Sequence, residues 1–155
     1  MLTGGAGCGK DTYYSRYKIE HSEKEVVRFA FADAIKDLMV KFFKWDRVDK
    51  EGKWRTILQQ LGRYFRDIDH NVWVDYIADD IKDWIDIHKE MDCVIFVNDL
   101  RFDGEVIRIK ELLPNYEVEV LRLHRDFESK LTEEQKNDIS ERGISDYLVD
   151  REIYS

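Results

Sequence analysis

The sequence predicts an α/β domain of three layers, in which helices flank a central, mostly parallel sheet. Stretches with the helical spacing of apolar residues alternate along the chain with short runs of β-branched and aromatic residues. The run Cys93–Val97 is apolar at every position, which is typical of a strand buried on both faces of a parallel sheet. A glycine-rich segment, Gly4–Thr12, comes directly before the first helical pattern.

Size and composition indicate a single domain over residues 1–155. Hydrophobic residues make up 43% of the chain, and no internal repeat or glycine- and serine-rich linker divides it. The longest unbroken apolar run, Cys93–Val97, is far shorter than a membrane span, so we expect no membrane partner. Two cysteines, Cys8 and Cys93, form no disulfide framework, and no apolar leader opens the chain, so we expect a cytoplasmic protein.

Apolar spacing predicts the elements of the first half of the chain. Only three residues precede Gly4, so the first strand is expected to be short. Asp33 stands directly before a run with helical spacing and is expected to cap that helix. In chain order we predict a helix over Lys10–Ile19, a strand over Val26–Phe31, a helix from Asp33 to Phe43, and helices over residues 54–68 and 71–85, the last capped by Asn71.

The second half continues the alternation of strands and helices. Pro114 is expected to stop one of these helices, because proline cannot continue a helix. In chain order we predict a strand over Cys93–Val97, a helix from Val106 to Leu113, a strand over Val118–Leu123, a short helix that begins with the capping box Thr132–Gln135, and a last strand within Tyr147–Tyr154.

The glycine-rich segment is the most informative stretch for function. It fits the pattern G-x-x-x-x-G-K, with an aspartate where Ser or Thr usually follows the lysine. Glycines let successive backbone N–H groups turn toward phosphate oxygens, and the helix that starts near Lys10 adds its dipole. Lys10 is expected to contact the β- and γ-phosphates; a merely flexible terminus is the alternative. The predicted nucleotide-binding residues are Gly4, Gly5, Ala6, Gly7, Cys8, Gly9, Lys10, Asp11 and Thr12.

Two carboxylates are expected to organise a cation. Asp11 beside a triphosphate would be repelled unless a cation lay between them, so we expect it to act through Mg²⁺; capping of the helix is the alternative. Asp99 follows the strand Cys93–Val97, the position at which nucleoside triphosphatases hold a metal-organising carboxylate. ATP and Mg²⁺ are therefore the predicted cofactors.

Charge is spread unevenly along the chain. The net charge is −8, but the segment Lys36–Arg66 carries nine basic and four acidic residues, so that segment is +5 and the remainder −13. The acidic total argues against a nucleic-acid polymer, which needs an extended basic face. A small anionic ligand needs only a local concentration of positive charge. We expect Lys41, Lys44, Lys50 and Lys53 to lie on a solvated helix face.

Four stretches in chain order carry a resemblance to a known family. They are GCGKDT over 7–12, FADAIK over 31–36, LQQLGRYFRDIDHNVWV over 58–74 and VNDLRFDGE over 97–105. The first is similar to a phosphate loop in which Asp follows the lysine. The third has paired glutamines, a glycine, an arginine and a later tryptophan, and the fourth has the pattern D-x-R-F-x-x-E. Together they resemble the bacteriophage-type deoxynucleoside monophosphate kinases, a branch of the P-loop kinases.

This resemblance implies a P-loop kinase fold and transfer of the ATP γ-phosphate to a (deoxy)nucleoside monophosphate. It also implies an acceptor-binding helical region over about residues 33–88. Trp73 stands at helical spacing, so burial in the core is the alternative to contact with the acceptor. Arg63 and Arg66 stand among apolar residues, and a structural role is their alternative. The implied catalytic residues are Lys10, Arg63, Arg66, Arg101 and Arg125; the implied substrate-binding residues are Lys36, Gln59, Gln60, Arg63, Arg66 and Trp73.

The family also has a lid that supplies arginines. The resemblance places a small lid over about residues 125–145, bracketed by Arg122, Arg125 and Arg142. We expect a monomer or a homodimer with a nucleoside monophosphate as its acceptor. Two alternatives stay open: another P-loop small-molecule kinase, for which the phosphate loop fits equally, and a nucleotide-binding protein without transferase activity.

Overall fold

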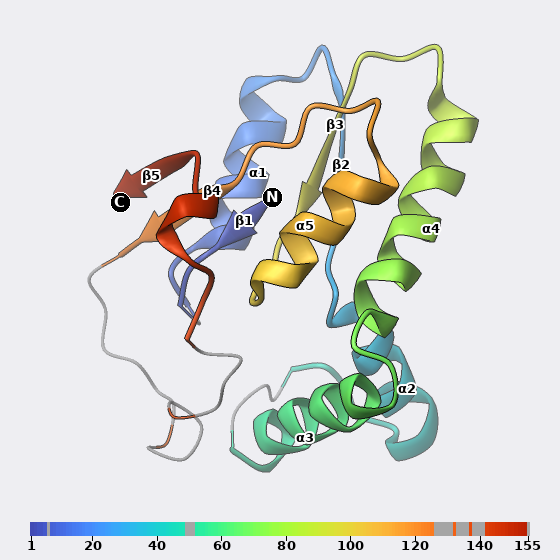
Figure 1. The fold of residues 1–155 in the computed structure, drawn as a ribbon, viewed down its shortest axis with the longest axis vertical. Coiled ribbons are helices and arrows are strands. Elements are labelled where there is room, and N and C mark those ends of the chain that lie inside the picture. Colours follow the sequence, from blue (N-terminus) through green and yellow to red (C-terminus); the bar gives the residue numbers. More distant parts are fainter. Residues whose placement is uncertain (6, 49–51, 126–131, 133–136, 138–141, 155) are drawn as a thin grey trace.

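A computed structural model describes residues 1–5, 7–48, 52–125, 132, 137 and 142–154 of the chain. Its elements alternate as an α/β fold requires (Figure 1). In chain order they are β1 (Leu2–Thr3), α1 (Lys10–Glu20), β2 (Glu25–Phe29), α2 (Asp33–Phe43), α3 (Gly52–Ile68), α4 (Val72–His88), β3 (Cys93–Val97), α5 (Asp103–Leu112), β4 (Leu121–His124), a 3₁₀ turn over Asp146–Leu148, and β5 (Arg151–Tyr154).

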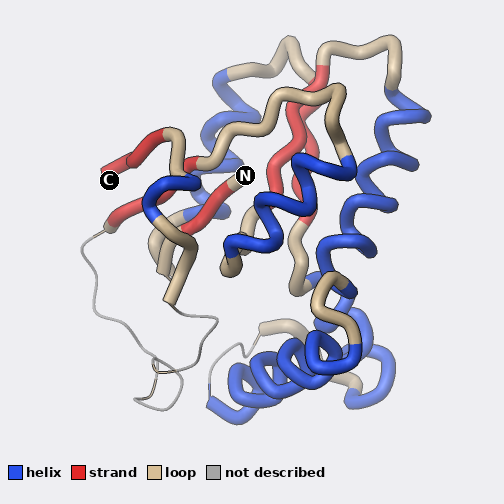
Figure 2. Tube along the Cα trace, viewed as in Figure 1, coloured by secondary structure: helices blue, strands red, loops and turns tan. Residues whose placement is uncertain are grey.

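All strand pairs in the described residues are parallel. β1, β4 and β5 form one sheet, in the order β1-β4-β5, and β2 pairs with β3 from Glu25–Cys93 to Phe29–Val97. A parallel bridge between Thr3 and Leu100 joins the two groups, so that the spatial order is β2-β3-β1-β4-β5 (Figure 2). Parallel strands end at the same edge, so the segments that follow β1, β2 and β3 come together there.

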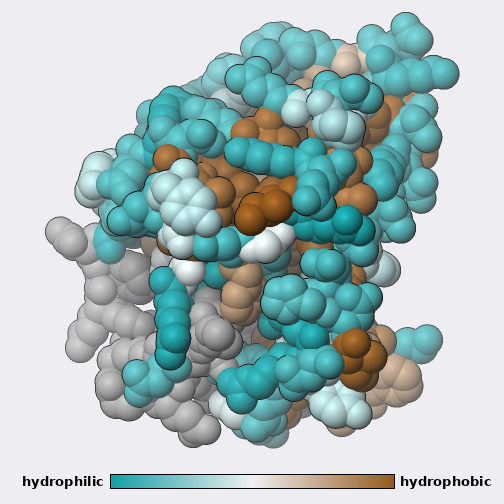
Figure 3. All heavy atoms as spheres, viewed as in Figure 1, coloured by the Kyte–Doolittle hydropathy of each residue, from teal (hydrophilic) through white to brown (hydrophobic). Residues whose placement is uncertain are grey.

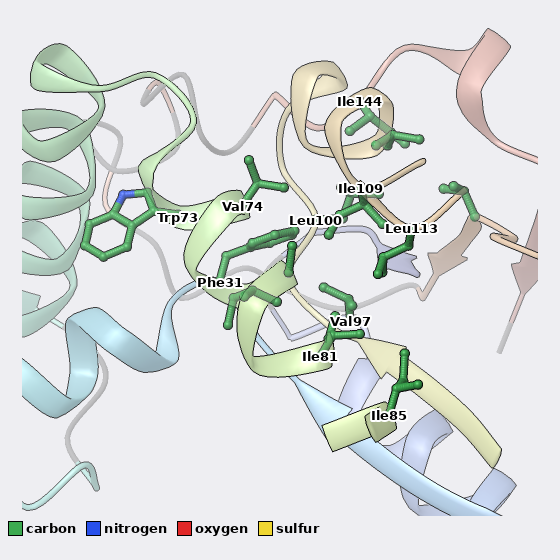
Figure 4. Packing of buried hydrophobic residues seen from close by; sticks show 14 of the residues in the cluster. Phe31, Trp73, Val74, Ile81, Ile85, Val97, Leu100, Ile109, Leu113 and Ile144 are labelled. Atoms are coloured by element: carbon green, nitrogen blue, oxygen red, sulfur yellow. The ribbon is translucent and has the colours of Figure 1, made fainter. Parts of the chain in front are cut away.

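Helices cover both faces of the sheet, which confirms the flanked, mostly parallel α/β architecture. Alternate residues of a strand point to opposite faces, and Phe96 and Val97 of β3 show this clearly. Phe96 packs against the tyrosines of α1, whereas Val97 belongs to the larger core formed with α4 and α5. Figure 4 shows this core, with Ile81 and Ile85 of α4 close to Val97.

Helices α2 and α3 lie beyond the end of the sheet, below it in Figure 1. Trp45, just after α2, and Trp54 of α3 form a tilted aromatic pair whose ring centroids are 5.9 Å apart. Phe65 of α3 packs on Trp73 of α4 at 5.1 Å. Between α3 and the edge of the sheet where the parallel strands end, the described residues leave a pocket, which is described below.

Most predicted elements are confirmed, with differences at their ends. The strand predicted over Val26–Phe31 is Glu25–Phe29, and beyond its end the N–H groups of Phe31 and Ala32 bond to the Asp99 side chain. Asp33 begins α2 but does not cap it; Ala32 holds that position. The strand predicted over Val118–Leu123 is Leu121–His124, since the Val120 N–H bonds to the Asp150 carboxylate instead of a ladder partner.

Other predictions are confirmed in part or fall outside the described residues. Asn71 is the N-cap position of α4, but its side chain makes no capping hydrogen bond. The capping box at Thr132–Gln135 and most of the expected lid lie outside the described residues. The face seen in Figure 3 is mainly hydrophilic, as the charged composition requires. None of the helices described is both long and apolar enough to span a bilayer.

Candidate functional site

The glycine-rich loop follows β1 and turns directly into α1. Gly4, Gly7 and Gly9 have φ angles of 134°, 86° and 98°, which favour glycine. A Cβ atom on Gly4 would lie 2.5 Å from the Leu123 carbonyl oxygen, so the loop is pressed against β4 at this point. Gly9 is the N-cap of α1, which leaves the first backbone N–H groups of that helix without intrahelical partners. This backbone is suited to bind an anion.

Lys10 lies over the loop that precedes it. Its Nζ atom donates to the carbonyl oxygens of Gly4 at 2.8 Å and Gly5 at 3.0 Å, and lies 3.5 Å from the Cys8 sulfur. Burial lowers the pKa of Lys10 from its ordinary value, while the nearby Cys8 thiol opposes that shift. The ammonium is therefore held at the centre of the glycine loop. Ala6 lies outside the described residues.

A hollow beside this loop brings together several predicted residues, and we call it the loop hollow. The helix-starting residues Lys10, Asp11 and Thr12 line it from one side. Asn98 and Asp99, directly after β3, line it from the other. Its remaining charged lining residues are Arg28, Lys36 and Arg125. The later part of the expected phosphate loop (Gly7, Gly9, Lys10, Asp11 and Thr12) thus shares one hollow with the expected lid arginine at position 125, whereas Gly4 and Gly5 line another hollow.

Asn98 is the buried polar residue of the loop hollow. Its side chain is 3% exposed, and Nδ2 donates to the Asp11 carboxylate at 3.1 Å. Because an ionised carboxylate only accepts hydrogen bonds, the NH₂ group must face Asp11 and the oxygen must point elsewhere. No described residue donates a hydrogen bond to Asn98 Oδ1. Sequence reasoning did not single out Asn98, since an Asn at a strand end carries no pattern.

Asp99 connects the end of β3 to the start of α2. Its Oδ1 atom accepts from the Phe31 N–H at 2.7 Å and its Oδ2 atom from the Ala32 N–H at 2.8 Å. Burial raises the pKa of Asp99 from its ordinary value, while these two N–H groups oppose that shift. The residue that was expected to organise a metal therefore has both oxygens bonded to backbone.

A second pocket lies between α3 and the end of the sheet, and we call it the arginine pocket. Four cationic side chains line it: Lys36, Arg55, Arg66 and Arg101. Two carboxylates, Asp99 and Glu105, also reach it, and the rest of its wall is largely apolar or aromatic. These other lining residues include Phe31, Ile35, Trp45, Leu58, Gln59, Gly62 and Trp73. A pocket of this composition is suited to a ligand that is anionic at one end and flat and apolar at the other.

Glu105 anchors the cationic wall of the arginine pocket. Its Oε2 atom accepts from the backbone N–H groups of Arg101 at 2.8 Å and Phe102 at 3.0 Å. Its Oε1 atom lies 4.0 Å from the Arg66 guanidinium, which stacks over the Phe102 ring at 4.3 Å. Glu105 is 6% exposed, and burial raises its pKa to about 7. Arg66 is thus fixed on two sides, and this fixes the direction of its remaining N–H groups.

Helix α3 divides the predicted residues between its two sides. Gln59 and Arg66 line the arginine pocket, whereas Gln60 and Arg63 are exposed and lie outside it. The spacing of residues 55, 59, 62 and 66 places them on one helix face, so Arg55 joins this set. Helical periodicity would have found Arg55 and separated Gln59 from Gln60. Arg55 was missed because the motif resemblance begins after it.

Trp73 contributes to the core and to the pocket wall together. It is 5% exposed, and its Nε1 atom donates to the Gly62 carbonyl oxygen at 3.2 Å. The alternative of burial, which its spacing indicated, is confirmed. Lys41, Lys44 and Lys53 are exposed, as expected for a solvated face, and Lys50 lies outside the described residues.

A third hollow lies between β1 and β4, on the far side of the glycine loop. Arg101, Arg122 and Arg142 line it together with Gly4 and Gly5. Arg122 donates to the Ile144 carbonyl oxygen at 2.7 Å, which holds the segment that carries Arg142. The three arginines expected around the lid are therefore divided, since Arg125 lines the loop hollow and the other two line this one.

The chain matches no protein-family model, and the search of curated proteins likewise returned no match. What the site can do must therefore follow from its own residues. Those residues combine a glycine loop whose backbone is suited to bind an anion with a separate cationic pocket at the same edge of a parallel sheet.

Proposed function

We propose that this protein is a P-loop kinase that transfers the γ-phosphoryl group of ATP, bound with Mg²⁺, to a (deoxy)nucleoside monophosphate. The products are ADP and a nucleoside diphosphate. One observation carries the proposal: the loop hollow and the arginine pocket meet at two residues, Lys36 and Asp99, which line both. A donor phosphate on the loop and an acceptor phosphate among the arginines would face each other there.

The acceptor assignment is supported by the composition of the arginine pocket. Arg55, Arg66 and Arg101 present guanidinium groups, which bind phosphate oxygens in pairs. The aromatic and aliphatic part of the wall, with Phe31 and Trp73, offers surface for a flat base. A non-nucleotide acceptor would leave this apolar surface without a partner, so a nucleotide fits the pocket better than a small phosphorylated or hydroxylated metabolite.

The glycine loop fits the triphosphate of ATP. The backbone at Gly4 leaves no space for a Cβ atom, and the first N–H groups of α1 point outward from Gly9. In the described residues no three His, Cys, Asp or Glu side chains gather as metal ligands. The loop hollow does offer hard oxygen donors, the Asp11 carboxylate and the Asn98 carboxamide, which suit Mg²⁺. When bound, Mg-ATP supplies the phosphoryl group and a cation that offsets charge on it.

The chain's own residues bind and align the two nucleotides. Lys10 exchanges its contacts with the carbonyl oxygens of Gly4 and Gly5 for phosphate oxygens, and so follows the charge that is transferred. Arg66, fixed by Glu105 and Phe102, holds the acceptor phosphate. An oxygen of that phosphate forms the new bond to the γ-phosphorus, and the bond to the β–γ bridging oxygen breaks. Alignment and charge neutralisation supply most of the catalysis, and no strong base is required.

A coupled assay tests this proposal. ADP formation is measured with ATP, Mg²⁺ and each common deoxynucleoside monophosphate, and the diphosphate product is identified by chromatography. We expect acceptor-dependent ADP formation that falls by orders of magnitude in Lys10→Ala, while Lys18→Ala, an exposed lysine on the same helix, retains it. Far-UV circular dichroism checks that both variants are folded.

The alternatives give different results in the same assay. Another P-loop small-molecule kinase would form ADP only with acceptors that are not nucleotides. A nucleotide-binding protein without transferase activity would bind ATP in calorimetry and form no ADP with any acceptor. Either result would overturn the proposed nucleoside monophosphate kinase.

A further inference from the structure

Asn98 lines the loop hollow, and its carboxamide oxygen is a buried acceptor to which no described residue donates. A buried polar atom without a partner is destabilising, and a bound cation would supply the missing partner of this oxygen. Because Nδ2 is bonded to Asp11, the free oxygen and the Asp11 carboxylate are presented from neighbouring positions. Two oxygen atoms of this kind, one neutral and one charged, form part of a coordination shell for a hard cation.

Asp99, the carboxylate that was expected to organise a cation, instead accepts hydrogen bonds from the backbone. Each of its oxygens accepts a backbone N–H group, from Phe31 or Ala32, at 2.7–2.8 Å. Moving Asp99 onto a cation would leave the start of α2 without those acceptors. Asn98 is the adjacent residue, and it lines the loop hollow at the same strand end.

We infer that Asn98, through Oδ1, and Asp11 hold the divalent cation that binds with the triphosphate, and that Asp99 positions α2 instead. This inference rests on the proposed function. Four cationic side chains of the loop hollow repel a lone cation: Lys10, Arg28, Lys36 and Arg125. The cation therefore binds together with the triphosphate, whose negative charge offsets those four side chains.

Calorimetry with a non-hydrolysable ATP analogue, in Mg²⁺ and in EDTA, tests the inference without any catalytic step. In the wild type, Mg²⁺ strengthens analogue binding. Asn98→Leu, close in size but without the oxygen, reduces that strengthening by about tenfold or more, and leaves affinity in EDTA unchanged. Asn115→Leu, at an exposed asparagine in a turn, behaves as the wild type.

Asn98→Asp provides a variant with the opposite expected effect. A second carboxylate beside Asp11 repels the triphosphate in EDTA and binds the cation more tightly, so the ratio of the two affinities rises above that of the wild type. Electron paramagnetic resonance of Mn²⁺ gives a direct readout: at a fixed concentration of Mn²⁺ and analogue, the further loss of free-ion signal on adding protein decreases in Asn98→Leu and increases in Asn98→Asp. Thermal melts confirm that each variant is folded.

The outcomes separate the two proposals. If the wild type binds the analogue more tightly in Mg²⁺ and Asn98→Leu does so equally, the role of Asn98 is overturned and the proposed function stands. If Asn98→Asp lowers the cation dependence, the role of Asn98 is likewise overturned. If the wild type binds no analogue in either condition, the proposed function is overturned, and the cation site with it.

Discussion

The Asp99 carboxylate accepts a hydrogen bond from the Ala32 N–H at 2.8 Å, and so ties the end of β3 to the residue that precedes α2. Its other oxygen holds the neighbouring N–H of Phe31. Lys36, one turn into α2, lines both the loop hollow and the arginine pocket. The position of Lys36 between the two hollows therefore depends on this contact across the sheet edge.

Asp99→Asn is expected to destabilise the protein and weaken acceptor binding. The substituted amide has one acceptor oxygen, so one backbone N–H loses its partner at a cost of about 1–3 kcal/mol. The start of α2 then shifts, and KM for the acceptor rises. Urea unfolding and steady-state kinetics measure the two effects. Asp86→Asn, at an exposed position of α4, should change stability by less than about 0.5 kcal/mol; equal effects of the two substitutions would contradict the assignment.

The two sides of α3 give a matched pair of arginines. Arg66 lines the arginine pocket, and Arg63, three residues earlier, is exposed outside it. Arg66→Ala is expected to raise KM for the acceptor about 10- to 100-fold, since a charge-assisted contact to phosphate contributes about 1.5–3 kcal/mol. Arg63→Ala should change KM less than about twofold, as expected of a surface substitution. An equal loss in both variants would show that the acceptor does not bind in this pocket.

The sequence predicted the alternation of elements and the glycine loop that turns into α1, because both depend on local patterns. The spacing of apolar residues predicts α4 and β3, and the glycines predict the turn before α1. Contacts between distant segments were not predictable in this way. The pairing of Asn98 with Asp11 joins residues 87 positions apart, and that of Asp99 with Phe31 spans 68. Such pairs depend on the strand order, which no local pattern specifies.

The arginine pocket was predicted less well than the glycine loop, for a related reason. Motif resemblance treats Gln59 and Gln60 alike, whereas a helix turns by about 100° per residue and points them in different directions. The periodicity of α3 contains the information that separates the two residues. That periodicity does not show that Arg101 and Glu105, from a distant part of the chain, form the opposite wall of the pocket.

Gly4 and Gly5 provide a test of the packing between the glycine loop and β4. Gly4→Ala would place a Cβ atom 2.5 Å from the Leu123 carbonyl oxygen, at a φ of 134° that L-residues rarely adopt. We expect a loss of stability of about 1–3 kcal/mol or more, since strain and backbone contact add. A Cβ on Gly5 meets no atom within 4 Å, so Gly5→Ala serves as the control. Urea unfolding compares the two; similar unfolding midpoints would contradict the close approach of the loop to β4.

Glu105 makes the stability of the fold depend on pH. Burial raises its pKa to about 7 from an ordinary value of 4.5, so between these two values the native state binds more protons than the unfolded state. Its contribution to stability is fully present below pH 4.5 and is lost as pH rises through 7. The loss is on the order of 3 kcal/mol, because each pKa unit corresponds to about 1.4 kcal/mol.

Glu105→Gln removes this dependence and isolates it. Both backbone N–H bonds go to Oε2, and a glutamine carbonyl oxygen can accept them equally. We expect the wild type to lose more stability than Glu105→Gln between pH 5 and pH 8, and the variant to be the more stable protein at pH 8. Urea unfolding at the two pH values measures this, with Glu117→Gln, at an exposed position, as the control. Parallel pH profiles for the wild type and Glu105→Gln would contradict this prediction. They would mean that the pKa of Glu105 is the same in the folded protein and in the unfolded chain, because the arginines that line its pocket offset the cost of its burial.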